Sequence, residues 1–366
     1  MKYPVNSIMV RKYLFSLATD RVKGIIPGCI KRFLFPLSLI YGLAVIFLIH
    51  ICRFFQLSLD CRVISVGNIT LGGTGKTTLV AYIAEVLKSE GHKVAIISRG
   101  YKNPAAPDTG NSSDYAGMGD EPFMLQEKLK DIPVIVDRDR FRAGKKAVQD
   151  YGVDSVILDD GMQQWRLKKD LEIVAVDTTN PFGNRCLLPR GILRQPIFSL
   201  QYADIFVLTK TNFSQDVAKI KEELHSINPG ALIVESFHSP VGFYDILNPH
   251  ELLGKESLKG LTVTVFSGIG DPASFKETVN GLGITVGLSF DFPDHHGYTQ
   301  KEIDEIIDSS RERKIETLIT TEKDSARLAH SGINYRNCKV LVLRIQIIIR
   351  DDEKVFSRRL RSIYTI

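Results

Sequence analysis

Apolar runs of strand length recur along this chain, and apolar-periodic segments of helix length separate them. Such an alternation predicts an α/β fold, in which helices cover both faces of a parallel sheet. Strands are predicted at 63–66, 93–98, 133–136, 155–159, 172–177 and 204–209, with helices at 79–87 and 123–129. After residue 261 the pattern restarts, with strands at 262–266, 284–290, 317–321 and 339–345. We therefore expect a larger core at 59–258 and a second, smaller α/β lobe at 259–366.

A glycine-rich turn joins the first predicted strand to the first predicted helix. Strand, glycine loop and helix in this order predict a P-loop NTPase type of sheet, whose loop N–H groups and helix N-terminus bind phosphate. Lys76 is suited to the β- and γ-phosphates, and the hydroxyl of Thr77 is suited to Mg²⁺. The predicted nucleotide-binding residues are Gly72, Gly73, Thr74, Gly75, Lys76, Thr77 and Thr78. Thr70 replaces the first glycine of the strict pattern, and a tight turn without a ligand is the alternative.

Two classes of P-loop protein lack their distinguishing residues here. Iron-protein-like ATPases carry a lysine before the Gly-Gly pair, where this chain has Leu71. GTPases read guanine with Asn-Lys-x-Asp, and the nearest stretch here, 209–212, is Thr-Lys-Thr-Asn. Both differences argue against assigning the chain to these classes, so we expect ATP as the nucleotide.

Residues 1–52 are basic first and then apolar. Residues 1–32 hold seven basic residues and only Asp20 as an acid, a net charge of +6, so the rest of the +5 chain sums to −1. Residues 33–52 carry no formal charge, although Pro36, Gly42 and His50 interrupt them. The positive-inside rule would hold the N-terminus in the cytoplasm, and a full span would then place the glycine loop outside, away from ATP. We interpret residues 1–58 as a monotopic or re-entrant anchor on anionic lipid, with a packed helix and a true span as alternatives.

The charge distribution and the cysteines exclude other classes. Because the basic charge is confined to the N-terminus, we expect no nucleic-acid partner. The five cysteines form no C-x-x-C pair, which fits a reducing compartment without structural zinc.

Acidic and basic residues follow several predicted strands. Asp159 and Asp160 end an apolar strand, the usual place for a carboxylate that binds Mg²⁺ beside a P-loop. Asp120 and Glu121 start a helix, where capping is the alternative. The segment 187–196 contains two arginines suited to an anionic substrate, Arg190 and Arg194. The stretch 102–119, rich in Pro, Gly, Ser and Asn, predicts a loop over the site.

These motifs together resemble the lipid A 4′-kinase (tetraacyldisaccharide 4′-kinase) family. The matching segments are PLSLIY at 36–41, VGNITLGGTGKTT, SRGY, GDEP, LDDGMQQ, FGN, LLPRGILRQP, SGIGDP, FPDHHGY and TTEKD. They extend from residue 36 to residue 324, and GDEP, DDG-x-Q and the late DHH are specific to the family. The chain departs from the family at Thr78, where proline is usual, and within LDDGMQQ and LLPRGILRQP.

The resemblance implies ATP-dependent phosphorylation of the 4′-hydroxyl of a tetraacylated glucosamine disaccharide 1-phosphate at the inner membrane. It implies that Asp120 is the base, with His295 as its partner, and that Glu121, Asp159 and Asp160 are metal-side carboxylates. A hydrogen-bonded surface or core histidine is the alternative for His295. The predicted substrate-binding residues are Arg99, Arg140, Asn184, Arg190 and Arg194.

Two rival functions remain open: a P-loop ATPase that acts as a switch, and a kinase of another membrane glycolipid. We predict no obligate protein partner. Asp120 and His295 lie 175 positions apart, in different predicted lobes, so we expect the lobes to close when the two residues pair.

Overall fold

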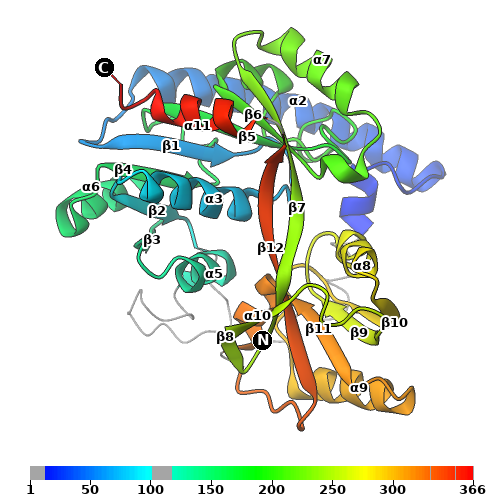
Figure 1. Ribbon diagram of the computed structural model, residues 1–366. Helices are drawn as coiled ribbons and strands as arrows, with labels where there is room; N and C mark the ends of the chain where they lie inside the picture. The colour runs from blue at the N-terminus through cyan, green and yellow to red at the C-terminus, as the bar shows by residue number, and fades with distance from the viewer. Residues whose placement is uncertain (1–12, 101–117, 330, 351, 366) are drawn as a thin grey trace. The chain divides into compact units, whose positions relative to one another are not determined.

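The computed structural model describes residues 13–100, 118–329, 331–350 and 352–365 (Figure 1). Most of the predicted loop at 102–119, and the first twelve residues of the basic segment, lie outside this range. The chain forms two compact units. The first comprises Met1–Arg99, Leu129–Phe237 and Ile348–Ile366, and the second comprises Gly100–Lys128 and His238–Ile347.

This division differs from the predicted boundaries at 258 and 259. Residues 100–128 and 238–258 belong to the second unit, whereas 348–366 return to the first. Two long strands, β7 (Leu232–Asp245) and β12 (Lys339–Arg350), each run through a boundary without interruption. The hydrophobic pattern therefore shows no break where the units meet in sequence, and the predicted strands included neither β7 nor the antiparallel strand β8 (Asn248–Gly254).

The first unit contains a parallel sheet in the order β7-β6-β5-β1-β4-β2-β3. Its remaining strands are β1 (Arg62–Gly67), β2 (Val94–Ser98), β3 (Val134–Val136), β4 (Ser155–Asp159), β5 (Leu171–Asp177) and β6 (Ile205–Thr209). These bounds confirm the predicted strands and the predicted α/β class. The four central strands are buried along almost their whole length, as the continuous apolar runs indicate.

Helices cover both faces of this sheet because side chains alternate along each strand. Helix α6 (Arg140–Tyr151) packs on the face that carries Val63 and Ala95. Helix α7 (Val217–Ile227) packs beside Val174 on the same face. Helix α3 (Lys76–Ser89), which leads from β1 across β4 to β2, contacts these three strands from the other face.

The second unit contains a smaller parallel sheet in the order β10-β9-β11-β12. Its other strands are β9 (Thr262–Ser267), β10 (Thr285–Asp291) and β11 (Thr317–Thr321). Helix α8 (Pro272–Gly281) packs on one face beside Val263 and Val265, and α9 (Gln300–Glu312) packs on the other beside Phe266. This unit also contains two short helices, α5 (Asp120–Lys128) and α10 (Glu322–Leu328), which pack against each other.

Helix α2 (Ile25–Phe54) is continuous for 30 residues and includes Pro36 and Gly42. It is long and apolar enough to cross a membrane by length and composition alone. One stripe of the helix is nevertheless buried against the rest of the first unit, namely Ser38, Gly42, Val45 and Ile49. The Ser38 hydroxyl donates to the carbonyl of Leu187 over 2.8 Å, and the Tyr41 hydroxyl donates to the carbonyl of Arg194 over 2.7 Å. The rest of the helix surface exposes large apolar side chains, namely Phe35, Leu39, Ile40, Leu43 and Phe47.

Candidate active site

The glycine loop adopts the conformation that its sequence requires. Gly72 and Gly75 have φ angles of 125° and 78°, where a β-carbon would strain the backbone. Gly75 is the N-cap of α3, which begins at Lys76, and the Thr78 hydroxyl donates to the Gly75 carbonyl over 2.8 Å. The side chain of Thr77 is buried in the first turn. The predicted strand–loop–helix order is confirmed, and the helix N-terminus has the free N–H groups that bind phosphate.

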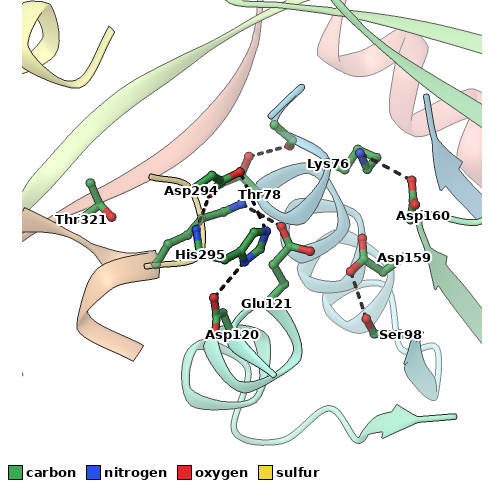
Figure 2. Close-up of polar contacts among 12 residues, drawn as sticks. Lys76, Thr78, Ser98, Asp120, Glu121, Asp159, Asp160, Asp294, His295 and Thr321 are labelled. Atoms are coloured by element: carbon green, nitrogen blue, oxygen red, sulfur yellow. Dashed lines mark hydrogen bonds and ion pairs between the residues drawn. The ribbon is translucent and has the colours of Figure 1, made fainter. Parts of the chain in front are cut away.

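Lys76 lies in a charged network at the end of the first unit's central strands. Its Nζ donates to Oδ1 of Asn68 over 3.1 Å and lies 3.5 Å from Oδ1 of Asp160, as Figure 2 shows for the carboxylate. The guanidinium of Arg194 donates to both carboxylate oxygens of Asp160 at 2.8 Å, and to the Asn68 carbonyl at 2.7 Å. Burial raises the pKa of Asp160, but the Arg194 hydrogen bonds and the Lys76 charge outweigh it and lower that pKa to about 2.

Asp159 lies beside the start of the glycine loop because its β4 position pairs with Val66 of β1. Its side chain is buried, and Oδ2 accepts a hydrogen bond from the Ser98 hydroxyl at 3.3 Å (Figure 2). Among the described residues, no group of three His, Cys, Asp or Glu side chains could hold a metal by itself. This arrangement fits Mg²⁺, which is usually held by one or two protein oxygens together with substrate phosphates and water. A Thr77 hydroxyl and an Asp159 carboxylate supply hard oxygen donors of that kind.

Asp120 and His295 are paired within the second unit. Oδ2 of Asp120, at the start of α5, lies 3.0 Å from Nδ1 of His295, on the loop after β10 (Figure 2). The same oxygen lies 2.5 Å from Nε of Arg327. The hydrogen bond to Asp120 raises the pKa of His295, with burial opposing it. Because both residues belong to one unit, the expectation that their pairing requires the lobes to close is wrong.

Glu121 forms an ion pair in the same unit. Its Oε1 lies 2.7 Å from Nζ of Lys323 in α10. Glu121, predicted to be a metal-side carboxylate, belongs to the second unit, and Asp159 and Asp160, predicted for the same role, belong to the first.

The predicted substrate-binding residues have different surroundings. Asn184 and Arg190 contact the N-terminal segment: the Arg190 guanidinium lies 2.9 Å from Oδ1 of Asp20, and the Asn184 amide donates to the Ala18 carbonyl over 2.7 Å. Arg140 is buried and donates to the Asp137 carbonyl over 2.5 Å. Burial lowers the pKa of Arg140. In this group, Arg99, which follows β2, is exposed.

Three residues in these networks received no role from the sequence. Asn68 lies within the matched segment VGNITLGG, and Asp324 ends TTEKD. Arg327 follows Asp324 by three positions, a spacing that places both side chains on one face of a helix. That spacing was the available signal for Arg327, but the partner across the unit, Asp120, is 207 positions away.

Comparisons with known proteins agree over nearly the whole chain. The family model described as tetraacyldisaccharide-1-P 4′-kinase matches residues 30–365. A tetraacyldisaccharide 4′-kinase of Halothermothrix orenii is 33% identical, over 93% of this chain and 95% of the relative. One of Elusimicrobium minutum is 35% identical, over 84% of each chain. The crystal structure of LpxK from Aquifex aeolicus in complex with ATP is 28% identical, with a TM-score of 0.70 over 92% of this chain and 99% of that chain.

Proposed function

The chain belongs to the tetraacyldisaccharide-1-P 4′-kinase family, and we propose that it transfers the γ-phosphate of ATP to the 4′-hydroxyl of a tetraacylated glucosamine disaccharide 1-phosphate. The observation that carries the proposal is the pairing of Asp120 with His295, at 3.0 Å between Oδ2 and Nδ1. A sugar hydroxyl is weakly acidic, so its attack on phosphorus needs a group that orients it and accepts its proton. A carboxylate held by a histidine is suited to both tasks.

The first unit supplies the nucleotide side of the proposed reaction. The glycine loop and the N-terminus of α3 bind the phosphates, and Lys76 neutralises the charge that develops on the β- and γ-phosphate oxygens. Thr77 and Asp159 would hold Mg²⁺, which would neutralise phosphate charge when bound. In this proposal Arg194 acts on Asp160 and Asn68 rather than on the lipid, because its guanidinium contacts both residues.

The lipid side of the proposal depends on helix α2. We propose that its exposed apolar face lies in the cytoplasmic leaflet of the inner membrane, while its docked stripe stays on the first unit. The kinase can then reach the lipid substrate while the acyl chains of that substrate stay in the membrane. Asn184 and Arg190, which contact the segment before α2, are the residues we assign to the anionic disaccharide. Arg99 remains a candidate for the same role, because it is exposed.

The test uses single and double variants of the pair, with labelled ATP, Mg²⁺ and a lipid A disaccharide precursor. Asp120→Ala and His295→Ala should each reduce kcat by about 10²–10⁴, the usual range for a general base. The double variant should be scarcely slower than the poorer single variant, because the two residues act as one unit. The affinity for ATP should barely change.

The matched control is His296→Ala, which removes the neighbouring histidine and its 3.1 Å contact with Glu302. This variant should keep the wild-type kcat. Strictly multiplicative losses in the double variant would show that Asp120 and His295 work independently. A large rise in the Kd for ATP in Asp120→Ala would instead assign that carboxylate to the metal. Transfer to water alone, with no phosphorylated lipid, would favour an ATPase.

A further inference from the structure

Arg327 of α10 joins three segments of the second unit. Its Nε lies 2.5 Å from Oδ2 of Asp120, and its Nη1 donates to the Gly268 carbonyl over 2.7 Å and to Oδ1 of Asp324 over 2.9 Å. The arginine is 7% exposed and Asp324 is fully buried. A guanidinium is planar and rigid, so three simultaneous contacts fix its orientation in the protein.

Asp324 is itself held in place by the surrounding backbone and side chains. Its Oδ1 accepts from the Gly268 amide at 3.0 Å and from the Tyr298 hydroxyl at 2.9 Å, and its Oδ2 accepts from the Thr321 hydroxyl at 2.7 Å. Gly268 belongs to SGIGDP and Asp324 to TTEKD, two matched segments for which the proposed reaction assigns no role. Both segments meet at Arg327, and through it they reach Asp120.

We propose that Arg327 is a positioning residue for the reaction: anchored by Asp324 and Gly268, it fixes the direction in which the Asp120 carboxylate faces. The inference rests on the proposed role of Asp120. A lysine could supply the charge, but its single ammonium could not reproduce the contacts that Nε makes with Asp120 and Nη1 makes with Gly268 and Asp324.

Several charged groups surround Asp120. Helix α10 contributes Arg327, Lys323 and Asp324, the loop after β10 contributes His295 and Asp294, and α5 itself contributes Glu121. Burial raises the pKa of Asp120, but the hydrogen bond to His295 and the charge and hydrogen bond of Arg327 outweigh it, so this pKa lies well below the ordinary value. The Arg327 charge also lowers the pKa of His295.

A carboxylate held in one direction can accept a hydrogen bond from the attacking hydroxyl along a fixed line. That suits phosphoryl transfer, in which the transition state is loose and the nucleophile must be oriented more than it must be deprotonated early. Loss of Arg327 removes the guanidinium contact with Oδ2, so α10 should no longer fix the direction of the Asp120 carboxylate.

The experiment compares Asp324→Asn with the double variant Asp324→Asn/Arg327→Met. The Asp324→Asn change removes the negative charge at this position, so the double variant does not leave an unpaired charge in the interior. Relative to Asp324→Asn, the double variant should lower kcat by about tenfold or more while the Kd for ATP barely changes, because the orientation of the acceptor matters in the transition state and not in nucleotide binding. The titration midpoint of the His295 ring, followed by NMR, should also move up.

A second variant separates charge from orientation. Arg327→Lys should leave the His295 midpoint near its wild-type position but reduce kcat by about tenfold or more, since the ammonium keeps the charge and loses the fixed geometry. The matched control is Arg336→Met, which removes an arginine of the same unit that lies 2.9 Å from Asp308. Its kcat and pH profile should equal those of the wild type.

A kcat equal to that of Asp324→Asn, together with an unmoved His295 midpoint in the double variant, would overturn the inference. Full kcat in Arg327→Lys would overturn the claim of orientation. Asp120→Asn, measured alongside, separates the two hypotheses: full kcat in that variant would overturn the proposed role of Asp120 itself. A large loss there, together with a kcat of the double variant equal to that of Asp324→Asn, would overturn the role of Arg327 alone.

Discussion

Arg194→Met distinguishes a substrate-binding arginine from one that organises the phosphate loop. In wild type, Arg194 donates two hydrogen bonds to Asp160 at 2.8 Å each and one to the Asn68 carbonyl at 2.7 Å. Methionine keeps much of the side-chain volume but removes all of these donors. The substitution therefore separates Asp160 and Asn68 from the segment that also receives the Tyr41 hydroxyl of α2.

The expected loss of stability follows from these contacts. A hydrogen bond to a charged group contributes about 1.5–3 kcal/mol, so the two bonds to Asp160 would account for about 3–6 kcal/mol. The Asp160 side chain is 40% exposed, and Lys76 remains 3.5 Å away. Solvent screening and this remaining cation reduce the expected loss by about half, to about 1.5–3 kcal/mol.

Urea unfolding can be followed by the fluorescence of Trp165, the single tryptophan, whose indole N–H donates to Gln195 over 3.3 Å. ATP binding should weaken by about tenfold, equivalent to about 1.4 kcal/mol, because the segment that positions Lys76 loses its anchor. The KM for the lipid should change little. The control Arg185→Met removes the exposed ion pair with Glu223 in the same unit and should cost less than about 1 kcal/mol.

A raised KM for the lipid, with unchanged stability and unchanged ATP affinity, would refute this reasoning. That result would return Arg194 to the role predicted from the sequence. Equal losses in Arg194→Met and Arg185→Met would show that the Asp160 network contributes no more than a surface ion pair.

Three further changes test other parts of the molecule. Lys76→Ala should abolish phosphoryl transfer without altering the circular dichroism spectrum, because Lys76 neutralises phosphate charge; wild-type turnover would contradict the P-loop assignment. Serine substitutions at exposed positions of α2 should abolish co-sedimentation with anionic liposomes; the positions are Phe35, Leu39, Leu43 and Phe47. The unfolding midpoint should stay near that of the wild type, because the buried stripe of the helix is unchanged. Continued sedimentation would locate the anchor elsewhere. Since the pKa of Asp160 is lowered to about 2, its contribution to stability should be complete above about pH 5 and disappear as the pH falls from about 4 towards 2. The free energy of unfolding of wild type minus that of Asp160→Asn should shrink over this range, and a difference that is constant with pH would contradict the assigned pKa.

Local features of the fold were readable from contiguous residues. The continuous apolar runs identify the strands of both sheets except β7, since parallel strands are buried on both faces. The glycine loop is equally local: Gly72 and Gly75 adopt positive φ angles that other residues rarely tolerate. The sequence also indicated an apolar N-terminal segment. It could not show that Pro36 would lie within a continuous helix, because the packing of Ser38 and Gly42 on the first unit supports α2 around that position.

The boundaries of the two units were decided by tertiary structure. The segment 100–128 lies between strands of the first unit in sequence, yet it belongs to the second because α5 packs on α10. The prediction from sequence instead assigned Asp120 to the same core as the glycine loop, because proximity along the chain was the only available guide. Strands β7 and β12 cross the boundaries without a change in their hydrophobic pattern.

The sequence by itself determined which chemistry is present: a phosphate loop, a set of carboxylates, a histidine and several arginines. Only the tertiary structure decided which of these residues meet. It directs Arg194 to Asp160 and Arg327 to Asp120, pairs that are 34 and 207 positions apart. Periodicity reports the face of one helix or strand on which a residue lies, but a long-range ion pair depends on how separate elements pack. The roles of the arginines therefore follow from packing, whereas the glycine loop follows from its own backbone.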